Sequence, residues 1–367
     1  MADILSIFGG FLVSVLLGLV LIPHILQISY RKRLFDLPDT RKVHTVPVPR
    51  LGGFSFFPVI LVSVCLILGI RHCIEYGVEA MPDDLVPGSF LFLAAGCTLL
   101  YLTGIADDLV GVGYRHKFVV QLLTASFLVA SGVWIDNLGG LFGIRTIPAW
   151  IGMPFTVLLV VYITNAINLI DGIDGLASGL CGLALAAFGI RLAQCGDYSG
   201  ALIASGTLGV LVPFWFYNVY GNAQRCHKLF MGDAGSLTLG YILSFLAIQV
   251  SKTSVPSAEV SDTGLVSAFS PLLVPLLDVV RVVLHRIRTG CNPFMPDRNH
   301  IHHKLLRAGL SPRAALFTIL CIAFLFVILN ALLDGLANIT WIVVADLVLW
   351  TLLHLFINWR ISLNEKP

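Results

Sequence analysis

Apolar stretches of similar length recur along the chain and are separated by short polar connections. A helix that spans a membrane needs about 20 consecutive, mostly apolar residues. Eleven segments meet this requirement, at about 4–29, 51–70, 88–106, 117–134, 149–167, 176–194, 199–217, 235–251, 264–284, 314–333 and 339–358. Since little sequence remains between them, the pattern predicts an all-α integral membrane protein with about 11 transmembrane helices, folded as a single domain over residues 1–367.

Composition agrees with lipid as the solvent of this chain. Hydrophobic residues make up 57% of it and charged residues only 12%, whereas soluble domains carry about 25% charged residues. The net charge of +2 creates no strong positive field, so we expect no nucleic-acid partner. The eight cysteines include no Cys-x-x-Cys pair, which argues against a disulfide framework or a zinc knuckle.

Lysine and arginine are unevenly divided between the two alternating sets of connections. All but four of the 23 lie in one set and the C-terminal tail, and the four exceptions are Arg71, Arg145, Arg191 and Lys252. Because positive charge concentrates in cytoplasmic loops, we expect the C-terminus in the cytoplasm and the N-terminus outside. The cytoplasmic loops then lie at about 30–50, 107–116, 168–175, 218–234 and 285–313.

Six aspartates gather at the cytoplasmic ends of the expected spans: Asp107, Asp108, Asp171, Asp174, Asp233 and Asp278. Like charges that meet at one depth need a cation or protons. Mg²⁺, for which Mn²⁺ can substitute, takes oxygen ligands and bridges carboxylates to substrate phosphates. Basic residues accompany the aspartates, at Arg115, Lys117, Arg298, His300, His302 and His303. The pattern therefore predicts phosphoryl transfer, in which positioning and charge stabilisation supply most of the catalysis.

Other chemistries fit the motifs less well. No Gly-x-x-x-x-Gly-Lys-Ser/Thr loop occurs, so we expect no ATP-driven machine. A zinc site is disfavoured because His302 and His303 would diverge on a helix and no cysteine stands at ligand spacing. A direct contact with phosphate or sugar fits better, and it would strengthen below neutral pH if the imidazolium form of His302 is the binder. The alternative is that these histidines only cap a helix.

Five motifs, in order along nearly the whole chain, resemble those of the polyprenyl-phosphate N-acetylhexosamine-1-phosphate transferases. They are DLPDTRKVH (36–44) with PRLGG (49–53), DD (107–108) with RHK (115–117), NAINLIDGIDG (165–175), FMGDAGS (230–236) and PDRNHIHH (296–303). The resemblance is closest to the bacterial branch that acts on undecaprenyl phosphate. It implies ten or eleven helices around a cytoplasmic active-site cleft, with a bent ninth helix. Pro271 and Pro275 supply a physical cause for that bend.

The resemblance implies transfer of GlcNAc-1-phosphate, or of a related N-acetylhexosamine-1-phosphate, from the UDP-sugar to undecaprenyl phosphate. UMP would be released, and the product would start a cell-envelope polysaccharide such as lipopolysaccharide or a cell-wall polymer. The implied partners are Mg²⁺ or Mn²⁺, the UDP-N-acetylhexosamine, undecaprenyl phosphate and the lipid of the bacterial inner membrane. The oligomeric state is left open, a homodimer included.

The same resemblance implies roles for individual residues. Asp233 is the expected principal metal ligand, with Asn168 as its partner. Asp107 and Asp108 are expected to bind or deprotonate the lipid phosphate. The catalytic set is completed by Asp171 and by Lys117, which resembles a residue that contacts phosphates. The expected substrate-binding residues are Asn168, Asp174 (toward uridine), Arg115, Arg298, His300, His302, His303, His44 and Arg50. Arg115 departs from the family pattern, which has lysine there.

Three alternatives remain at the level of sequence. Within the same family, a phospho-muramoyl-pentapeptide transferase would carry a different histidine motif in the last cytoplasmic loop. A secondary transporter would place its ionisable residues near the bilayer midplane. Here most acidic residues lie at one end of the spans. Asp346, within the last span, is the exception, and we interpret it as a helix–helix contact. A non-catalytic scaffold or flippase component would have lost the acidic motifs, and all of them are present.

Overall fold

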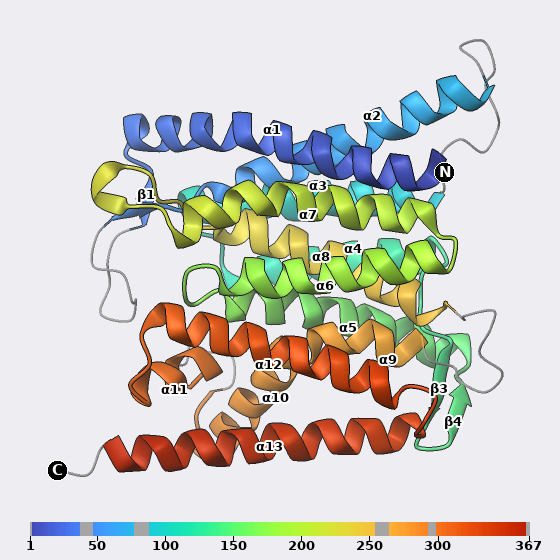
Figure 1. Cartoon of the computed structure of the whole chain (residues 1–367), viewed down its shortest axis with the longest axis vertical. Coiled ribbons are helices and arrows are strands. Elements are labelled where there is room, and N and C mark those ends of the chain that lie inside the picture. The colour runs from blue at the N-terminus through green and yellow to red at the C-terminus, as the bar shows by residue number, and fades with distance from the viewer. Residues whose placement is uncertain (1, 37–46, 77–87, 254–263, 293–298, 365–367) are drawn as a thin grey trace.

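The computed structural model describes residues 2–36, 47–76, 88–253, 264–292 and 299–364, and it shows a bundle of long helices that run side by side (Figure 1). Within these residues, ten helical segments are long and apolar enough to cross a membrane. They are α1 (Ala2–Lys32), α2 (Phe56–Tyr76), α3 (Gly88–Val110), α5 (Ala149–Ile170), α6 (Leu176–Gln194), α7 (Tyr198–Val219), α8 (Gly232–Ser251), the continuous segment from α9 (Gly264–Phe269) to α10 (Leu273–Arg288), α12 (Pro312–Leu333) and α13 (Ile339–Asn364). The prediction of an all-α, multi-pass membrane protein is confirmed.

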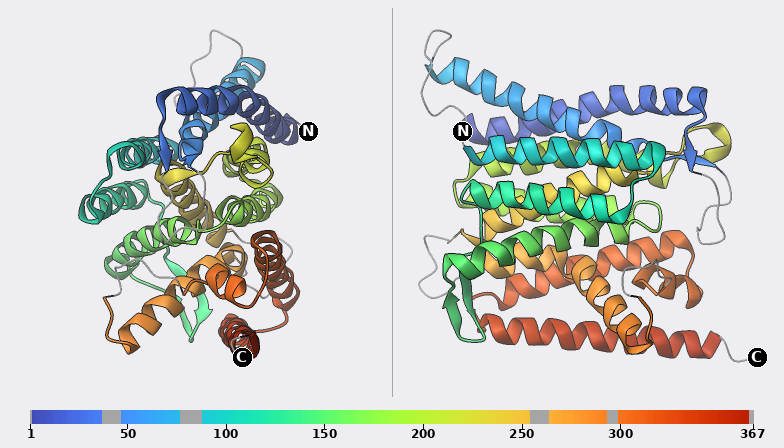
Figure 2. Two further views of the ribbon diagram at one scale, coloured as in Figure 1. Left: turned by 90° about the vertical axis from the view of Figure 1, so that its left-hand side faces the viewer. Right: turned by 180° about the vertical axis from the view of Figure 1, so that it is seen from behind.

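The difference from the eleven expected spans is α4 (Tyr114–Ala130), which has only 17 residues. It begins three residues before the expected segment at 117–134 and ends four residues before it, because Ser131 and Gly132 turn the chain. The helix nevertheless lies alongside α3 and α5 in the bundle (Figure 2). Consistent with an odd number of passes, α1 begins and α13 ends at opposite ends of the bundle (Figure 1).

Short elements mark the two ends of the bundle. At one end β1 (Phe35–Asp36) pairs antiparallel with β2 (Val48–Pro49), and η1 (Gly52–Ser55) follows. At the other end β3 (Asn137–Leu141) pairs antiparallel with β4 (Ile144–Thr146) (Figure 1). Near the first end lie η2 (Ala223–Arg225) and the short helix α11 (Ile301–Arg307). The motif-bearing connections therefore share one end, which is the end that carries β1 and β2.

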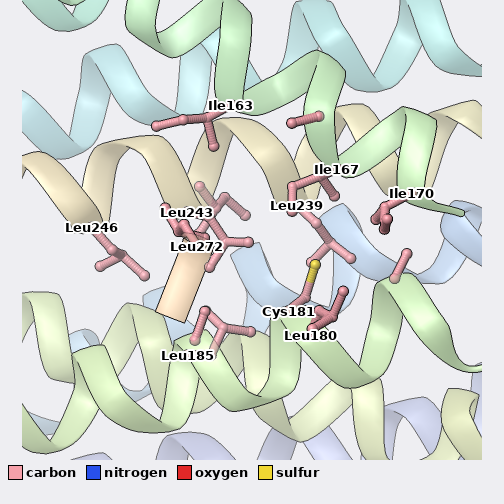
Figure 3. Packing of buried hydrophobic residues seen from close by; sticks show 14 of the residues in the cluster. Ile163, Ile167, Ile170, Leu180, Cys181, Leu185, Leu239, Leu243, Leu246 and Leu272 are labelled. Carbon is pink, nitrogen blue, oxygen red and sulfur yellow. The ribbon is translucent and has the colours of Figure 1, made fainter. Parts of the chain in front are cut away.

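Helix α8 is the centre of the bundle, and all its residues from Ala234 to Ile248 are buried. Leu239, Leu243 and Leu246 of α8 pack with Ile163 and Ile167 of α5, and residues of α6 close the cluster (Figure 3). On the opposite side, α3 approaches closely at Gly104, where a Cβ would overlap the backbone of Ala234. Small residues let membrane helices approach to backbone contact, and this packing aligns the ends of α3, α5 and α8.

The expected bend in the segment at 264–284 is present. Between α9 and α10 the chain forms a 3-10 turn, η3 (Ser270–Leu272), with Pro271 in its first turn. Proline lacks a backbone N–H and therefore interrupts the α-helical hydrogen bonds at this point. After the turn, α10 leans away from its neighbours toward α13 (Figure 2), and Asp278 in its second turn accepts a hydrogen bond from Ile301, the first residue of α11.

Helix α13 is joined to α12 by a buried polar contact. Asn330 of α12 donates to Asp346 Oδ2 and to Ser270 Oγ, each at 2.9 Å. Asp346 is 4% exposed. Its interpretation as a helix–helix contact is confirmed, because a polar pair inside a membrane bundle ties neighbouring helices together.

Candidate active site

The first acidic residue placed by this packing is Asp108, at the end of α3. Its carboxylate accepts hydrogen bonds from the backbone N–H groups of Asp233 (2.9 Å) and Ala234 (3.0 Å). These are among the first N–H groups of α8, which have no partner inside the helix. Asp108 thus caps α8 from another helix, and its negative charge lies at the positive end of the α8 dipole.

Asp233, in the first turn of α8, shares a cation with Asp107. The Lys117 ammonium, from α4, lies 2.8 Å from Asp233 Oδ2 and 2.9 Å from Asp107 Oδ2. On its other side, Asp233 Oδ1 accepts from Asn168 Nδ2 (2.9 Å), which also donates to Ser236 Oγ (2.8 Å). Two carboxylates can lie this close because the ammonium between them offsets their repulsion. Four expected site residues therefore converge.

These four residues, Asp107, Lys117, Asn168 and Asp233, form a carboxylate cluster whose composition suits a magnesium ion. Asp107, Asp233 and Asn168 supply carboxylate and amide oxygens, and Mg²⁺ prefers oxygen ligands while it keeps several waters or substrate phosphates. The Lys117 ammonium already occupies a cation position between the two carboxylates. No group of three or more His, Cys, Asp or Glu side chains that could enclose a metal occurs among the described residues. The residues therefore fit an ion that the protein binds through one or two carboxylates, with substrate completing its shell.

The connection from α5 to α6 carries Asp171 and Asp174 beside this group. Lys228 forms an ion pair with Asp174, and the side chain of Asn218 links Gly175 N–H to the carbonyl of Leu229. Burial by the surrounding protein, followed by the negative charges of Asp233 and Asp174, raises the pKa of Asp171 to about 7. Asp171 can therefore exchange a proton near neutral pH.

The histidine segment, residues 299–303, contacts the connection from α5 to α6 at Gly172. His302 is 1% exposed, and its ring lies so close to Gly172 that a Cβ there would overlap Nε2. Its ring stacks on that of His300 (5.9 Å between centroids, 4° between planes), and the His303 ring lies 4.2 Å away. Burial, and then the charges of His303 and His300, lower the pKa of His302 to about 3. This shift disfavours the imidazolium form of His302 as the form that contacts phosphate, because the surrounding protein encloses the ring.

The sequence is similar to a family profile and to several named proteins. The sequence profile of the family described as glycosyl transferase family 4 matches residues 90–251. A Bacillus subtilis protein named probable undecaprenyl-phosphate N-acetylglucosaminyl 1-phosphate transferase is 34% identical over 324 residues, which cover 86% of this chain and 82% of that protein. This chain belongs to glycosyl transferase family 4.

Two further members of the family carry the name undecaprenyl-phosphate alpha-N-acetylglucosaminyl 1-phosphate transferase. The protein from Yersinia pestis is 30% identical over 342 residues, covering 92% of this chain and 88% of that protein. The protein from Escherichia coli K12 is 29% identical over 310 residues, covering 84% and 78%. The profile match, 90–251, runs from α3 to α8 and so includes the carboxylate cluster, whereas the histidine segment lies beyond it.

The remaining expected site residues are placed less centrally. Arg115 is exposed on α4, where its Nε donates to Tyr114 Oη (3.2 Å) and its guanidinium lies over the Tyr114 ring. Arg50 is exposed directly after β2, and its carbonyl lies beside Gly232 at the start of α8. His44 and Arg298 lie outside the described residues.

Several contributors were not singled out as site residues from the sequence. Lys228, which pairs with Asp174, comes from the connection between α7 and α8. Asn218, which bridges two loops, lies in the last turn of α7. Asp278 and Arg281, on α10, contact the histidine segment. The spacing of Asp278 and Arg281, three apart on a helix, was a signal for a local ion pair, but nothing in the sequence shows which segment the pair faces.

Proposed function

We propose that this protein transfers GlcNAc-1-phosphate from UDP-GlcNAc to undecaprenyl phosphate at the cytoplasmic face of the bacterial inner membrane, with release of UMP. The names of its relatives support the acceptor and the transferred group. The observation that carries the proposal is the shared cation: one ammonium lies between Asp107 and Asp233, at the N-terminus of α8. A helix N-terminus beside carboxylates that hold a cation is suited to a diphosphate.

The reaction exchanges one phosphoanhydride bond for another. An oxygen of the lipid phosphate attacks the phosphorus that bears the sugar, and the bond from this phosphorus to the bridging oxygen breaks. UMP leaves with the bonding electrons and the bridging oxygen. Bound Mg²⁺, held by Asp233 with Asp107 and Asn168, would supply positive charge against the donor diphosphate. Since the bonds broken and formed are alike, the reaction needs no separate energy source.

The protein's own groups have distinct tasks in this scheme. The N–H groups of the first turn of α8 and the Lys117 ammonium present positive charge to phosphate oxygens. Asp108 is committed to capping α8, so it holds the helix end in place. Asp171, with its pKa of about 7, takes up the proton of a monoprotonated lipid phosphate. Asp174 and Lys228 hold the edge of the site beside Asp171, where we place the nucleotide.

The proposed orientation puts the N-terminus outside and the C-terminus in the cytoplasm. It follows from the division of lysine and arginine between the two bundle ends. UDP-sugars are soluble nucleotides of the cytoplasm, so a donor site among the basic loops agrees with this orientation. The same arrangement disfavours a secondary transporter, since the acidic groups lie at one end of the bundle instead of at mid-depth.

A donor panel tests the proposal. Purified protein in lipid nanodiscs would be given undecaprenyl phosphate with UDP-GlcNAc, UDP-GalNAc or UDP-muramoyl-pentapeptide, and lipid products would be separated by chromatography. We expect UDP-GlcNAc to give the highest kcat/KM and the pentapeptide donor to give no product. Preference for the pentapeptide donor would instead make the protein a peptidoglycan-pathway transferase. Absence of any lipid product from all three donors would refute the assignment as an enzyme of this class.

A further inference from the structure

The side chain of Asp278 on α10 is fully buried, at 0% exposure, although it is an acidic residue. It does not belong to the carboxylate cluster. Three donors surround it. Oδ2 accepts from His300 Nδ1 (2.8 Å), and Oδ1 accepts from the backbone N–H of Ile301 (3.0 Å) and from Arg281 Nη2 (2.9 Å). A buried carboxylate with this many hydrogen bonds is stable only while all its partners stay in place.

These partners come from one short stretch of the histidine segment. Arg281 also donates to the carbonyl of Asn299, so α10 is tied to three consecutive residues, Asn299, His300 and Ile301. Ile301 is the first residue of α11, and its N–H has no acceptor within that helix. Asp278 therefore caps α11 from a neighbouring helix, and it fixes both the start and the direction of α11.

The position of α11 in turn decides where His302 lies. The His302 ring, one residue after the anchored Ile301, is seated against the backbone of Gly172. Neither ring nitrogen of His302 has a hydrogen-bond partner among the described residues, so this seat is maintained by packing and by the anchor at the preceding residues. Gly172 lies between Asp171 and Asp174, which face the proposed nucleotide position.

We propose that Asp278 is a positioning residue for the UDP-sugar donor. It touches no reacting atom in this scheme; it holds His300 and the start of α11 so that His302 is seated on Gly172 and the connection from α5 to α6 keeps its shape. The proposal rests on the proposed function, because it assigns the effect to donor use. Loss of the anchor should therefore impair the donor and leave the lipid acceptor unaffected.

The test compares Asp278→Asn with a matched control, Asp346→Asn. Both aspartates are buried, at 0% and 4% exposure, but Asp346 bonds to Asn330 of α12, and within the described part of the chain it makes no hydrogen bond to α11. In Asp278→Asn one oxygen must serve donors that two oxygens served, and Arg281 loses its charge partner. Loss of one charge-assisted hydrogen bond at the anchor should raise the donor KM about tenfold or more, with the acceptor KM changed less than about twofold. Asp346→Asn should leave both KM values within about twofold of wild type.

A second measurement does not depend on how Asp278→Asn folds. Gly172→Ala places a methyl group against the His302 ring, so it should reduce donor kcat/KM about as strongly as His302→Ala. The double variant should be no worse than His302→Ala alone, because removal of the ring removes the overlap. Multiplication of the two single effects would show that the contact between Gly172 and His302 does not position the donor loop.

The outcomes separate this proposal from the proposed function. Wild-type protein that makes no lipid product from UDP-GlcNAc would refute the proposed function itself. Active wild-type protein, with equal donor KM values for Asp278→Asn and Asp346→Asn, would refute only the role of Asp278. An equal rise in the donor and acceptor KM values of Asp278→Asn would also refute it, since a general loss of structure would then be the cause.

Discussion

Replacement of Lys117 by methionine tests whether its ammonium neutralises Asp107 and Asp233 in the carboxylate cluster. Methionine keeps the length and much of the packing of lysine but removes the charge that lies 2.8 Å from Asp233 and 2.9 Å from Asp107. Without it, two carboxylates at the bundle end face one another with no cation between them. Lys117→Met should therefore be less stable than wild type whenever divalent metal is absent.

The magnitude follows from the burial of the three side chains, which are 22%, 16% and 25% exposed for Lys117, Asp107 and Asp233. Breaking a fully buried ion pair costs about 3–5 kcal/mol, and an exposed pair contributes about 0–1 kcal/mol. For this intermediate exposure we expect a loss of about 2 kcal/mol. At about 2 °C per kcal/mol, the unfolding temperature should fall by about 4 °C.

The assay is thermal unfolding in detergent with EDTA or with MgCl₂, followed by tryptophan fluorescence. Mg²⁺ at about 100 times its Kd would add about 2.7 kcal/mol. Its effect should be larger in Lys117→Met than in wild type, because no ammonium has to be displaced. The control is Lys252→Met, whose ammonium bonds to the Gly132 carbonyl at the other end of the bundle. Unfolding temperatures in EDTA that are equal for wild type and Lys117→Met would refute the assigned neutralising role.

Four further predictions concern metal, pH, orientation and the histidine segment. EDTA should abolish transfer and Mg²⁺ or Mn²⁺ restore it, and Asp233→Asn should stay folded but lose most activity; near-normal turnover of this variant would exclude Asp233 as a metal ligand. Because a carboxyl with a pKa of about 7 is protonated below that pH and ionised above it, kcat/KM should rise through pH 7, and Asp171→Asn should lose this limb of the profile. In variants that keep a single exposed cysteine, a membrane-impermeant thiol reagent should label Cys73 only from outside and Cys226 only from the cytoplasm; labelling of both from one side contradicts the orientation. The defect of His302→Ala in donor affinity should not deepen between about pH 8 and about pH 6, because the pKa of His302 is lowered to about 3; a deepening at low pH would restore the imidazolium interpretation.

Much of the fold was accessible from the sequence because lipid imposes a simple length rule on apolar helices. The bend at Pro271 was predictable for a similarly local reason, namely the missing N–H of proline. The length of α4 was not, since apolar residues continue past the turn at Ser131 and Gly132. Where a helix stops within an apolar run depends on its neighbours in the bundle.

The residues of the carboxylate cluster could also be predicted from the sequence, because motifs at the same end of neighbouring helices lie close together. Their individual partners were not. Asp107 and Asp108 are adjacent in sequence, yet one binds Lys117 and the other caps α8, because adjacent side chains on a helix point in different directions. The neutral state of His302 and the anchoring by Asp278 depend on how α10, α11 and the connection from α5 to α6 pack, and no local pattern encodes that arrangement.

The measurement that tests the central claim most directly follows both halves of the donor in one reaction. UDP-GlcNAc would carry ¹⁴C in the sugar and ³²P in the phosphate attached to the sugar, and the acceptor would be unlabelled undecaprenyl phosphate. The account predicts that the lipid product contains ¹⁴C and ³²P in the donor's own ratio, and that the nucleotide product is unlabelled UMP. A lipid that carries ¹⁴C alone, with ³²P-labelled UDP released, would show transfer of the sugar without its phosphate and would contradict the account.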